Sequence, residues 1–114
     1  YSCKTRKERN IMERTITNLS KLKGRVYVYL ANADIGKSFM SHAKAEGFKL
    51  GKADPTTKEP AEIMAVNLNK TINYVGSIGS AAFHSNLDTI GGEPLIRVDY
   101  GKFVSGEDEY MISK

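Results

Sequence analysis

The chain has 114 residues, of which 40% are hydrophobic and 26% are charged, and this suits one globular domain with a modest core. Its single cysteine cannot form a disulfide within the chain, so a disulfide-rich extracellular scaffold is excluded and we expect a cytoplasmic location. The longest apolar run, residues 26–31, is far shorter than the ~20 residues that cross a bilayer, and we expect no membrane partner.

The net charge of +4 is unevenly distributed along the chain. Residues 1–25 hold eight Lys or Arg against two Glu, a net of +6, whereas the remaining residues hold nine against eleven, a net of −2. The sequence therefore predicts a basic N-terminal arm or helix over residues 1–24, followed by a single α+β domain over residues 25–114. Such an arm can steer a protein toward nucleic acid or another anionic surface, or it can be a solvated helix.

The first half of the chain predicts two helices that flank a strand. Apolar residues at loose helical spacing indicate a helix within residues 5–23. Residues 25–30, Arg-Val-Tyr-Val-Tyr-Leu, are typical of a strand with its aliphatic side chains on one face and its tyrosines on the other. Apolar residues four apart then predict a helix over residues 33–46, with Asn32 or Asp34 as its N-cap.

The second half of the chain combines strands with one short helix. After a polar loop at 49–60, the predicted elements are strands at 63–68 and 71–75, a helix at 78–84, a strand at 95–100 and an edge strand at 110–112. The resulting β-α-β-β-α-β order is typical of a ferredoxin-like fold, an antiparallel sheet with helices on one face. A looser α+β fold is the alternative.

Residues suited to catalysis or metal binding are sparse. The two histidines, His42 and His84, have no partner at metal-ligand spacing, and we expect them to be structural or surface residues. Residues 76–80, Gly-Ser-Ile-Gly-Ser, could offer backbone N–H groups to a phosphate, although a tight turn is the plainer explanation. We therefore predict no catalytic residue, no metal and no cofactor, in a protein that is not an enzyme.

The tyrosine face of the predicted sheet is the first candidate binding surface. If helices cover the aliphatic face, Tyr27 and Tyr29 lie on an open face. Arg97 and Asp99 of the last strand would share that face and form an ion pair across it. Exposed Tyr and Arg are favoured at protein interfaces and in sheets that stack nucleic-acid bases. Tyr74 is a further candidate, and burial of the tyrosines under the N-terminal helix is the alternative.

Two charged segments are the other candidate surfaces. The acidic run near the C-terminus either docks on a basic protein surface or is simply solvated, and it consists of Glu107, Asp108 and Glu109. The cations that would grip phosphates all lie within the first 25 residues: Lys4, Arg6, Lys7, Arg9, Arg14, Lys21, Lys23 and Arg25.

Four short segments carry a resemblance to known proteins: Glu46–Phe48, Ile72–Gly76, Ile96–Tyr100 and Ser105–Asp108. They resemble segments of small accessory proteins that phages and mobile elements of Gram-positive bacteria carry, and the resemblance covers residues 25–112. Some proteins of that kind are anti-CRISPR inhibitors, which block a nuclease by occupying its DNA-binding groove. The resemblance therefore implies a CRISPR nuclease as the partner, although the basic arm departs from the pattern of a strongly acidic DNA mimic.

We expect a non-enzymatic macromolecule-binding protein, an inhibitor of the anti-CRISPR kind that acts by protein–protein contact on a host nuclease. The alternative is a nucleic-acid-binding module that uses the basic arm and the sheet tyrosines. An enzyme that acts on a phosphorylated small molecule at residues 76–80 is the third hypothesis. An open sheet face or edge would also support a homodimer.

Overall fold

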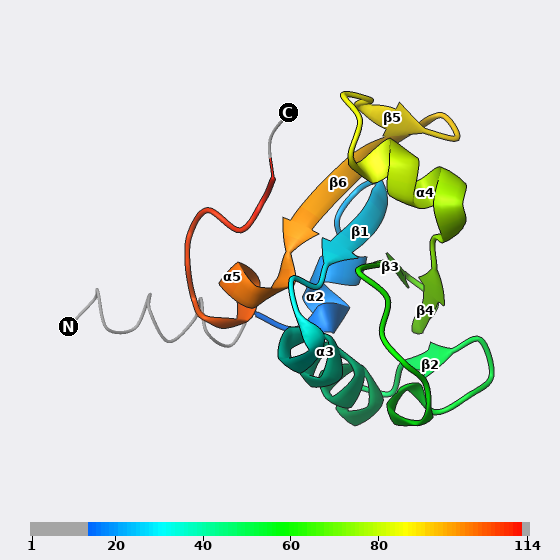
Figure 1. Ribbon diagram of the computed structural model, residues 1–114, viewed down its shortest axis with the longest axis vertical. Coiled ribbons are helices and arrows are strands. Elements are labelled where there is room, and N and C mark those ends of the chain that lie inside the picture. Colours follow the sequence, from blue (N-terminus) through cyan, green and yellow to red (C-terminus); the bar gives the residue numbers. More distant parts are fainter. Residues whose placement is uncertain (1–13, 113–114) are drawn as a thin grey trace.

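A computed structural model describes residues 14–112 of the chain. Its centre is a six-stranded sheet in the order β2-β4-β3-β1-β6-β5 (Figure 1). The strands are β1 (Arg25–Tyr29), β2 (Lys49–Leu50), β3 (Ile63–Asn67), β4 (Thr71–Tyr74), β5 (Thr89–Ile90) and β6 (Glu93–Asp99). The helices in this part of the chain are α2 (Ile16–Ser20), α3 (Ala33–Ala45), α4 (Gly76–Phe83) and α5 (Tyr100–Val104), with a 3₁₀ turn η1 (Pro55–Thr57).

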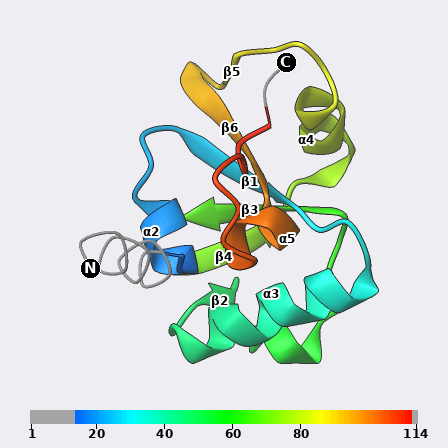
Figure 2. The ribbon, with the colours of Figure 1, turned by 90° about the vertical axis from the view of Figure 1, so that its left-hand side faces the viewer.

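The sheet is mixed in direction. Strand β1 pairs in parallel with β6 and antiparallel with β3, whereas β4 pairs antiparallel with β3 and in parallel with β2. Helices α2, α3 and α5 pack on one face of the sheet and α4 packs on the other (Figures 1 and 2). The predicted α+β class is confirmed. The ferredoxin-like arrangement is not confirmed, because the sheet is mixed and α4 covers the second face.

The main core lies on the face that α2, α3 and α5 cover. Val26 and Val28 of β1 point into it and are 2% and 0% exposed, as the alternation of residues 25–30 predicted. Phe39 of α3 meets the ring of Tyr100 edge-on, with 5.1 Å between the ring centroids. Burial of each such side chain contributes roughly 1.5–3 kcal/mol, so this face supplies most of the driving force for folding.

The predicted helix over residues 33–46 is confirmed as α3. Asn32 is its N-cap, and the Asn32 side chain accepts a hydrogen bond from the Ile35 backbone N–H at 2.9 Å. Gly47 follows the helix with φ +86°, a left-handed conformation that glycine adopts at helix ends without steric cost.

The chain after β6 differs from the prediction. Helix α5 begins at Tyr100, where a strand was expected, because the Asp99 side chain accepts a hydrogen bond from the Lys102 backbone N–H and caps a helix there. The edge strand predicted at residues 110–112 is reduced to one bridge, between Val98 and Met111.

The described part of the N-terminal arm packs into the main core. Ile16 of α2 is fully buried, and the predicted helix over residues 5–23 has its described helical part at residues 16–20. The Glu46 carboxylate accepts hydrogen bonds from the Ile16 and Thr17 backbone N–H groups at 2.9 and 2.7 Å, which ties α2 to the end of α3. Across residues 14–112, no helix has the length and apolarity needed to cross a membrane.

Candidate functional site

Arg97 is a buried anchor and not an interface residue. Its side chain is on the second face of the sheet, under α4, and the residue is 5% exposed. The guanidinium donates to four backbone carbonyls around the C-terminal end of α4: Phe83 at 2.7 Å, Ala82 at 3.0 Å, Ser85 at 3.1 Å and Leu87 at 2.8 Å. The predicted ion pair with Asp99 is wrong, because the Arg97 guanidinium instead donates to backbone carbonyls at the end of α4.

The tyrosines of β1 are also covered by α4. Tyr27 is 6% exposed, and its hydroxyl lies 3.5 Å from where a side chain at Gly79 would begin. Tyr29 is half-buried and stacks on Phe83, with ring centroids 6.1 Å apart. The prediction of an open tyrosine face is therefore wrong for Tyr27 and Arg97, since a helix that carries Ala82 and Phe83 fills that space.

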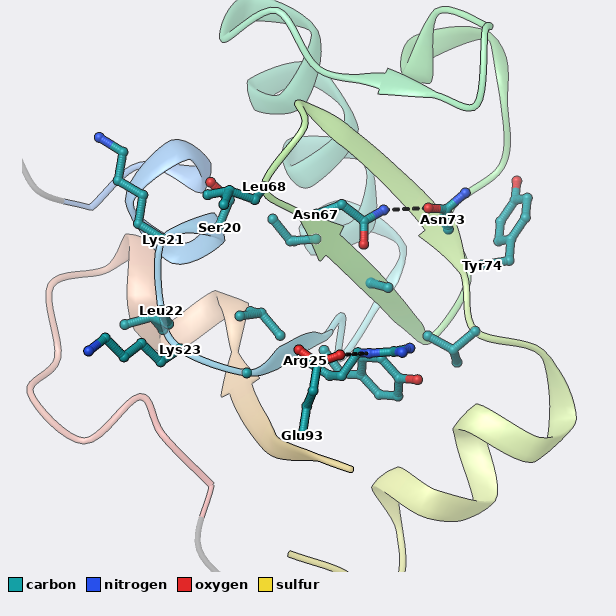
Figure 3. A pocket seen from close by; sticks show the side chains of 16 residues that line it. Ser20, Lys21, Leu22, Lys23, Arg25, Asn67, Leu68, Asn73, Tyr74 and Glu93 are labelled. Carbon is teal, nitrogen blue, oxygen red and sulfur yellow. Dashed lines mark hydrogen bonds and ion pairs between the residues drawn. The ribbon is translucent and has the colours of Figure 1, made fainter. Parts of the chain in front are cut away.

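A groove of about 590 Å³ marks the part of the sheet that α4 leaves uncovered (Figure 3). It crosses the ends of β1, β3 and β4 and continues to the loop between α2 and β1. Its lining consists of residues 20–27, 65–68 and 73–75 together with Glu93. We call this feature the sheet groove.

The cations of the sheet groove come from the segment that joins α2 to β1 and from the first residue of β1. Lys21, Lys23 and Arg25 are all exposed, and Figure 3 shows both lysines pointing outward at one side of the groove. The Arg25 Nε donates to the Glu93 carboxylate at 2.9 Å. This hydrogen bond, together with the negative charge of Glu93, raises the pKa of Arg25.

The opposite side of the sheet groove is polar and aromatic. Asn67 of β3 donates through its side-chain N–H₂ to the side chains of Thr71 and Asn73 on β4, and the bond to Asn73 is drawn in Figure 3. These two bonds use both protons of the Asn67 amide and leave its Oδ1 as an acceptor. Tyr74 is 49% exposed, and its hydroxyl donates to the Glu59 carbonyl at 2.6 Å, which holds the ring in place.

The sheet groove thus combines exposed cations, amide groups and an aromatic ring whose hydroxyl is hydrogen-bonded. Neither a family model, nor a curated protein, nor a solved structure matches this chain. The function is therefore inferred from the sheet groove and, separately, from the exposed acidic segment at residues 107–109.

Arg14 has a structural partner set that its position in the basic arm did not indicate. It donates to the carbonyls of Phe103 and Glu107 at 3.0 and 2.7 Å, and its side chain is 10% exposed. The guanidinium also lies over the rings of Phe103 and Tyr110, at 5.4 and 4.6 Å from their centroids. Arg14 therefore holds the C-terminal segment in place, and the prediction that it grips phosphate is not supported by this geometry.

The acidic run and Asp99, within the part of the chain that the structure describes, do not line the sheet groove. Glu107, Asp108 and Glu109 are exposed on the segment that Arg14 holds, and the Asp108 carboxylate is 3.9 Å from Arg14. Asp99 is half-buried and serves as the cap of α5. The other four predicted cations, Lys4, Arg6, Lys7 and Arg9, lie outside the described residues.

Each histidine side chain has a polar partner in the fold, and the glycine-rich segment at residues 76–80 begins a helix. His42 Nδ1 is 2.6 Å from the buried Tyr100 hydroxyl, and His84 Nε2 is 3.2 Å from the Glu62 carboxylate. Residues 76–80 form the first turns of α4, with Gly76 at φ +71°. Among residues 14–112, no group of three His, Cys, Asp or Glu side chains is arranged to hold a metal ion.

Proposed function

We propose that this chain is a non-enzymatic binding protein whose sheet groove holds single-stranded nucleic acid. The observation that carries the proposal is that three exposed cations, Lys21, Lys23 and Arg25, line a groove over the open end of the sheet. Cations that line a groove can contact the phosphates of a nucleic-acid backbone, and these contacts supply affinity that does not depend on the base sequence.

The opposite side of the sheet groove supports a role for the bases. The ring of Tyr74 is half-exposed and its hydroxyl is anchored, so a base stacking on it meets a platform that needs little ordering. The Oδ1 of Asn67 can accept a hydrogen bond from a base amino group. A single strand presents unstacked bases and backbone together, whereas a duplex hides its base faces.

This mode of binding differs from stacking on the β1 tyrosines. Tyr27 is buried under α4, so no base can stack on its face without displacing that helix. Binding is proposed to rest on phosphate contacts and on Tyr74, and base preference is expected to be modest.

The test measures the affinity of the full chain for a fluorescent oligothymidylate by anisotropy at several salt concentrations. The double variant Lys21→Glu/Lys23→Glu is expected to lose at least about tenfold in affinity at low salt. The slope of log K against log salt should become shallower by about 1.4, at ~0.7 for each lost contact to a single strand. Lys37→Glu/Lys58→Glu is the matched control, because both lysines are exposed and neither lines the sheet groove.

Equal loss in the two double variants would count against the sheet groove, since it would mean that net charge alone sets the affinity. A separate variant with Gln at Lys4, Arg6, Lys7 and Arg9 measures what the start of the arm contributes. If the wild-type chain fails to bind the oligonucleotide at low salt, the proposed function is wrong.

A protein partner at the acidic segment is the second candidate function. Here the chain would be an inhibitor of the anti-CRISPR kind that contacts a host nuclease through Glu107, Asp108 and Glu109. The supporting observation is that Arg14 holds the backbone of this segment while the acidic side chains stay exposed, so binding there would lose little backbone entropy.

A cleavage assay with a purified CRISPR nuclease separates the second candidate from the first. Neutralising the three acidic residues to Gln, Asn and Gln should abolish inhibition, and Lys21→Glu/Lys23→Glu should leave it unchanged. An absence of inhibition by the wild-type chain across nucleases of different types would remove this candidate.

A further inference from the structure

Glu93 places a carboxylate at the cationic side of the sheet groove. It starts β6, and because side chains alternate along a strand it projects from the same face as Leu95 and Arg97. Arg25 lies opposite Leu95 in the parallel pairing of β1 with β6, and this register brings the Arg25 and Glu93 side chains next to each other. Their hydrogen bond, 2.9 Å long, is drawn in Figure 3.

The ion pair between Arg25 and Glu93 is short but contributes little stability. The two side chains are 49% and 52% exposed, and ion pairs this exposed to water add little to stability. A guanidinium carries five N–H donors, and the hydrogen bond found for Arg25 among the described residues uses Nε only. The Nη groups of Arg25 are therefore available to a second acceptor.

The hairpin that carries Glu93 is shaped to let the Arg25 guanidinium lie against it. Gly91, at the turn between β5 and β6, has φ +60°, and a side chain there would begin 3.2 Å from Arg25 Nη2. Glycine at this position leaves room for the guanidinium, so the hairpin tip, Glu93 and Arg25 form one local arrangement at the end of the groove.

We propose that Glu93 is an internal competitor for phosphate at Arg25, an inference that rests on the proposed function of the sheet groove. In the free protein the Glu93 carboxylate accepts from the Arg25 Nε and offsets the positive charge of the guanidinium. When a nucleic-acid strand binds, one of its phosphates accepts from the Arg25 Nη groups in the bidentate geometry that suits Arg. The Glu93 carboxylate then lies next to the negative charge of that phosphate. Glu93 would thereby lower affinity for any polyanion and restrict binding to strands that also engage Lys21 and Lys23.

The test is the affinity of Glu93→Gln in the same anisotropy assay. This variant is expected to bind the oligothymidylate about fivefold more tightly at low salt, which corresponds to ~1 kcal/mol. Glu62→Gln is the matched control: its carboxylate is exposed, pairs with His84 and does not line the groove, and the change in net charge is the same. We expect Glu62→Gln to bind within about twofold of the wild type.

A double-mutant cycle with Arg25→Gln tests whether Glu93 acts through that arginine. In the Arg25→Gln background, Glu93→Gln should gain no more than Glu62→Gln does. A full fivefold gain in that background, or equal effects of Glu93→Gln and Glu62→Gln in the wild-type background, would overturn the competition.

The two proposals fail in distinguishable ways. If Lys21→Glu/Lys23→Glu weakens binding while Glu93→Gln matches its control, the sheet groove stands and the competitor role falls. If the wild-type chain does not bind the oligonucleotide, both fall.

Discussion

Replacement of Arg97 by Met should detach α4 from the second face of the sheet. Met keeps a similar apolar stem but removes every hydrogen-bond donor, so the carbonyls that the guanidinium now satisfies lose a partner. The Ala82 carbonyl is the least affected, because it also accepts from the Ser85 N–H at 3.2 Å and from the Ser85 hydroxyl at 2.6 Å.

The size of the effect follows from how deeply each carbonyl is buried. The bond to Phe83 is buried, and its loss is expected to cost ~2 kcal/mol, while the partly buried bonds to Ser85 and Leu87 cost ~0.5–1 kcal/mol each. The free energy of unfolding should therefore fall by about 3–4 kcal/mol, a large part of the ~5–15 kcal/mol typical of a domain.

Urea denaturation followed by far-UV circular dichroism measures this change. With an m value of ~1.5–2 kcal/mol/M, the midpoint for Arg97→Met should fall by about 2 M. Arg97→Lys keeps a positive charge but cannot span four carbonyls, and it should lie between wild type and Met, which provides a readout if the Met variant fails to fold. A Met variant within about 1 kcal/mol of wild type would refute the anchoring role.

Three further perturbations test other parts of the structure. His42→Ala should cost ~1–2 kcal/mol by leaving the buried Tyr100 hydroxyl unpaired, and adding Tyr100→Phe should then cost little more by denaturant titration. Hydrogen bonds, of which the one from Lys44 has the largest effect, lower the pKa of Asp54 to about 2. The ionised carboxylate therefore stabilises the fold fully above the unfolded-state pKa of 3.8, and this stabilisation is lost as the pH falls toward 2. The stability difference between wild type and Asp54→Asn should therefore be constant above about pH 5 and shrink between pH 4 and 2. Gly24→Ala should lower the free energy of unfolding by ~1–2 kcal/mol and the melting temperature by several degrees, because φ is +144° and a Cβ would collide with a backbone carbonyl of β6.

Local periodicity was enough to place β1 and α3, because their side chains alternate or recur within one element. The two-residue strands β2 and β5 gave no such signal, since they exist only through pairing with β4 and β6. Helix α5 was missed because Tyr100 extends an apolar strand pattern, and the cap formed by Asp99 becomes visible only once the chain turns.

The face assignment shows a clear limit of sequence reasoning here. Alternation correctly put Tyr27 and Val26 on opposite faces, but it does not tell what covers each face. The apolar content of α4, with Ala82 and Phe83 one after the other, was a signal that this helix needs a sheet to cover. A lone arginine at position 97 inside an apolar strand was a second signal, because such a charge is buried only when it has partners.

The lining of the sheet groove was predicted in part. Lys21, Lys23 and Arg25 were expected to be available cations, and they line the sheet groove. The sequence did not indicate Asn67, because its position in the groove depends on the register of β3 against β1 and β4, which no local pattern fixes. Arg14 belonged by sequence to the same basic arm, yet its contacts with the C-terminal segment lie about ninety positions away in the chain.

The most direct test of the central claim is a titration of the ¹⁵N-labelled full chain with an oligothymidylate of about eight nucleotides, followed by amide chemical shifts. Binding in the sheet groove predicts that the largest changes fall on residues 21–25, on Asn67 and on Tyr74, and that residues 107–109 hardly move. Changes centred on residues 107–109, or none at saturating oligonucleotide, would contradict it.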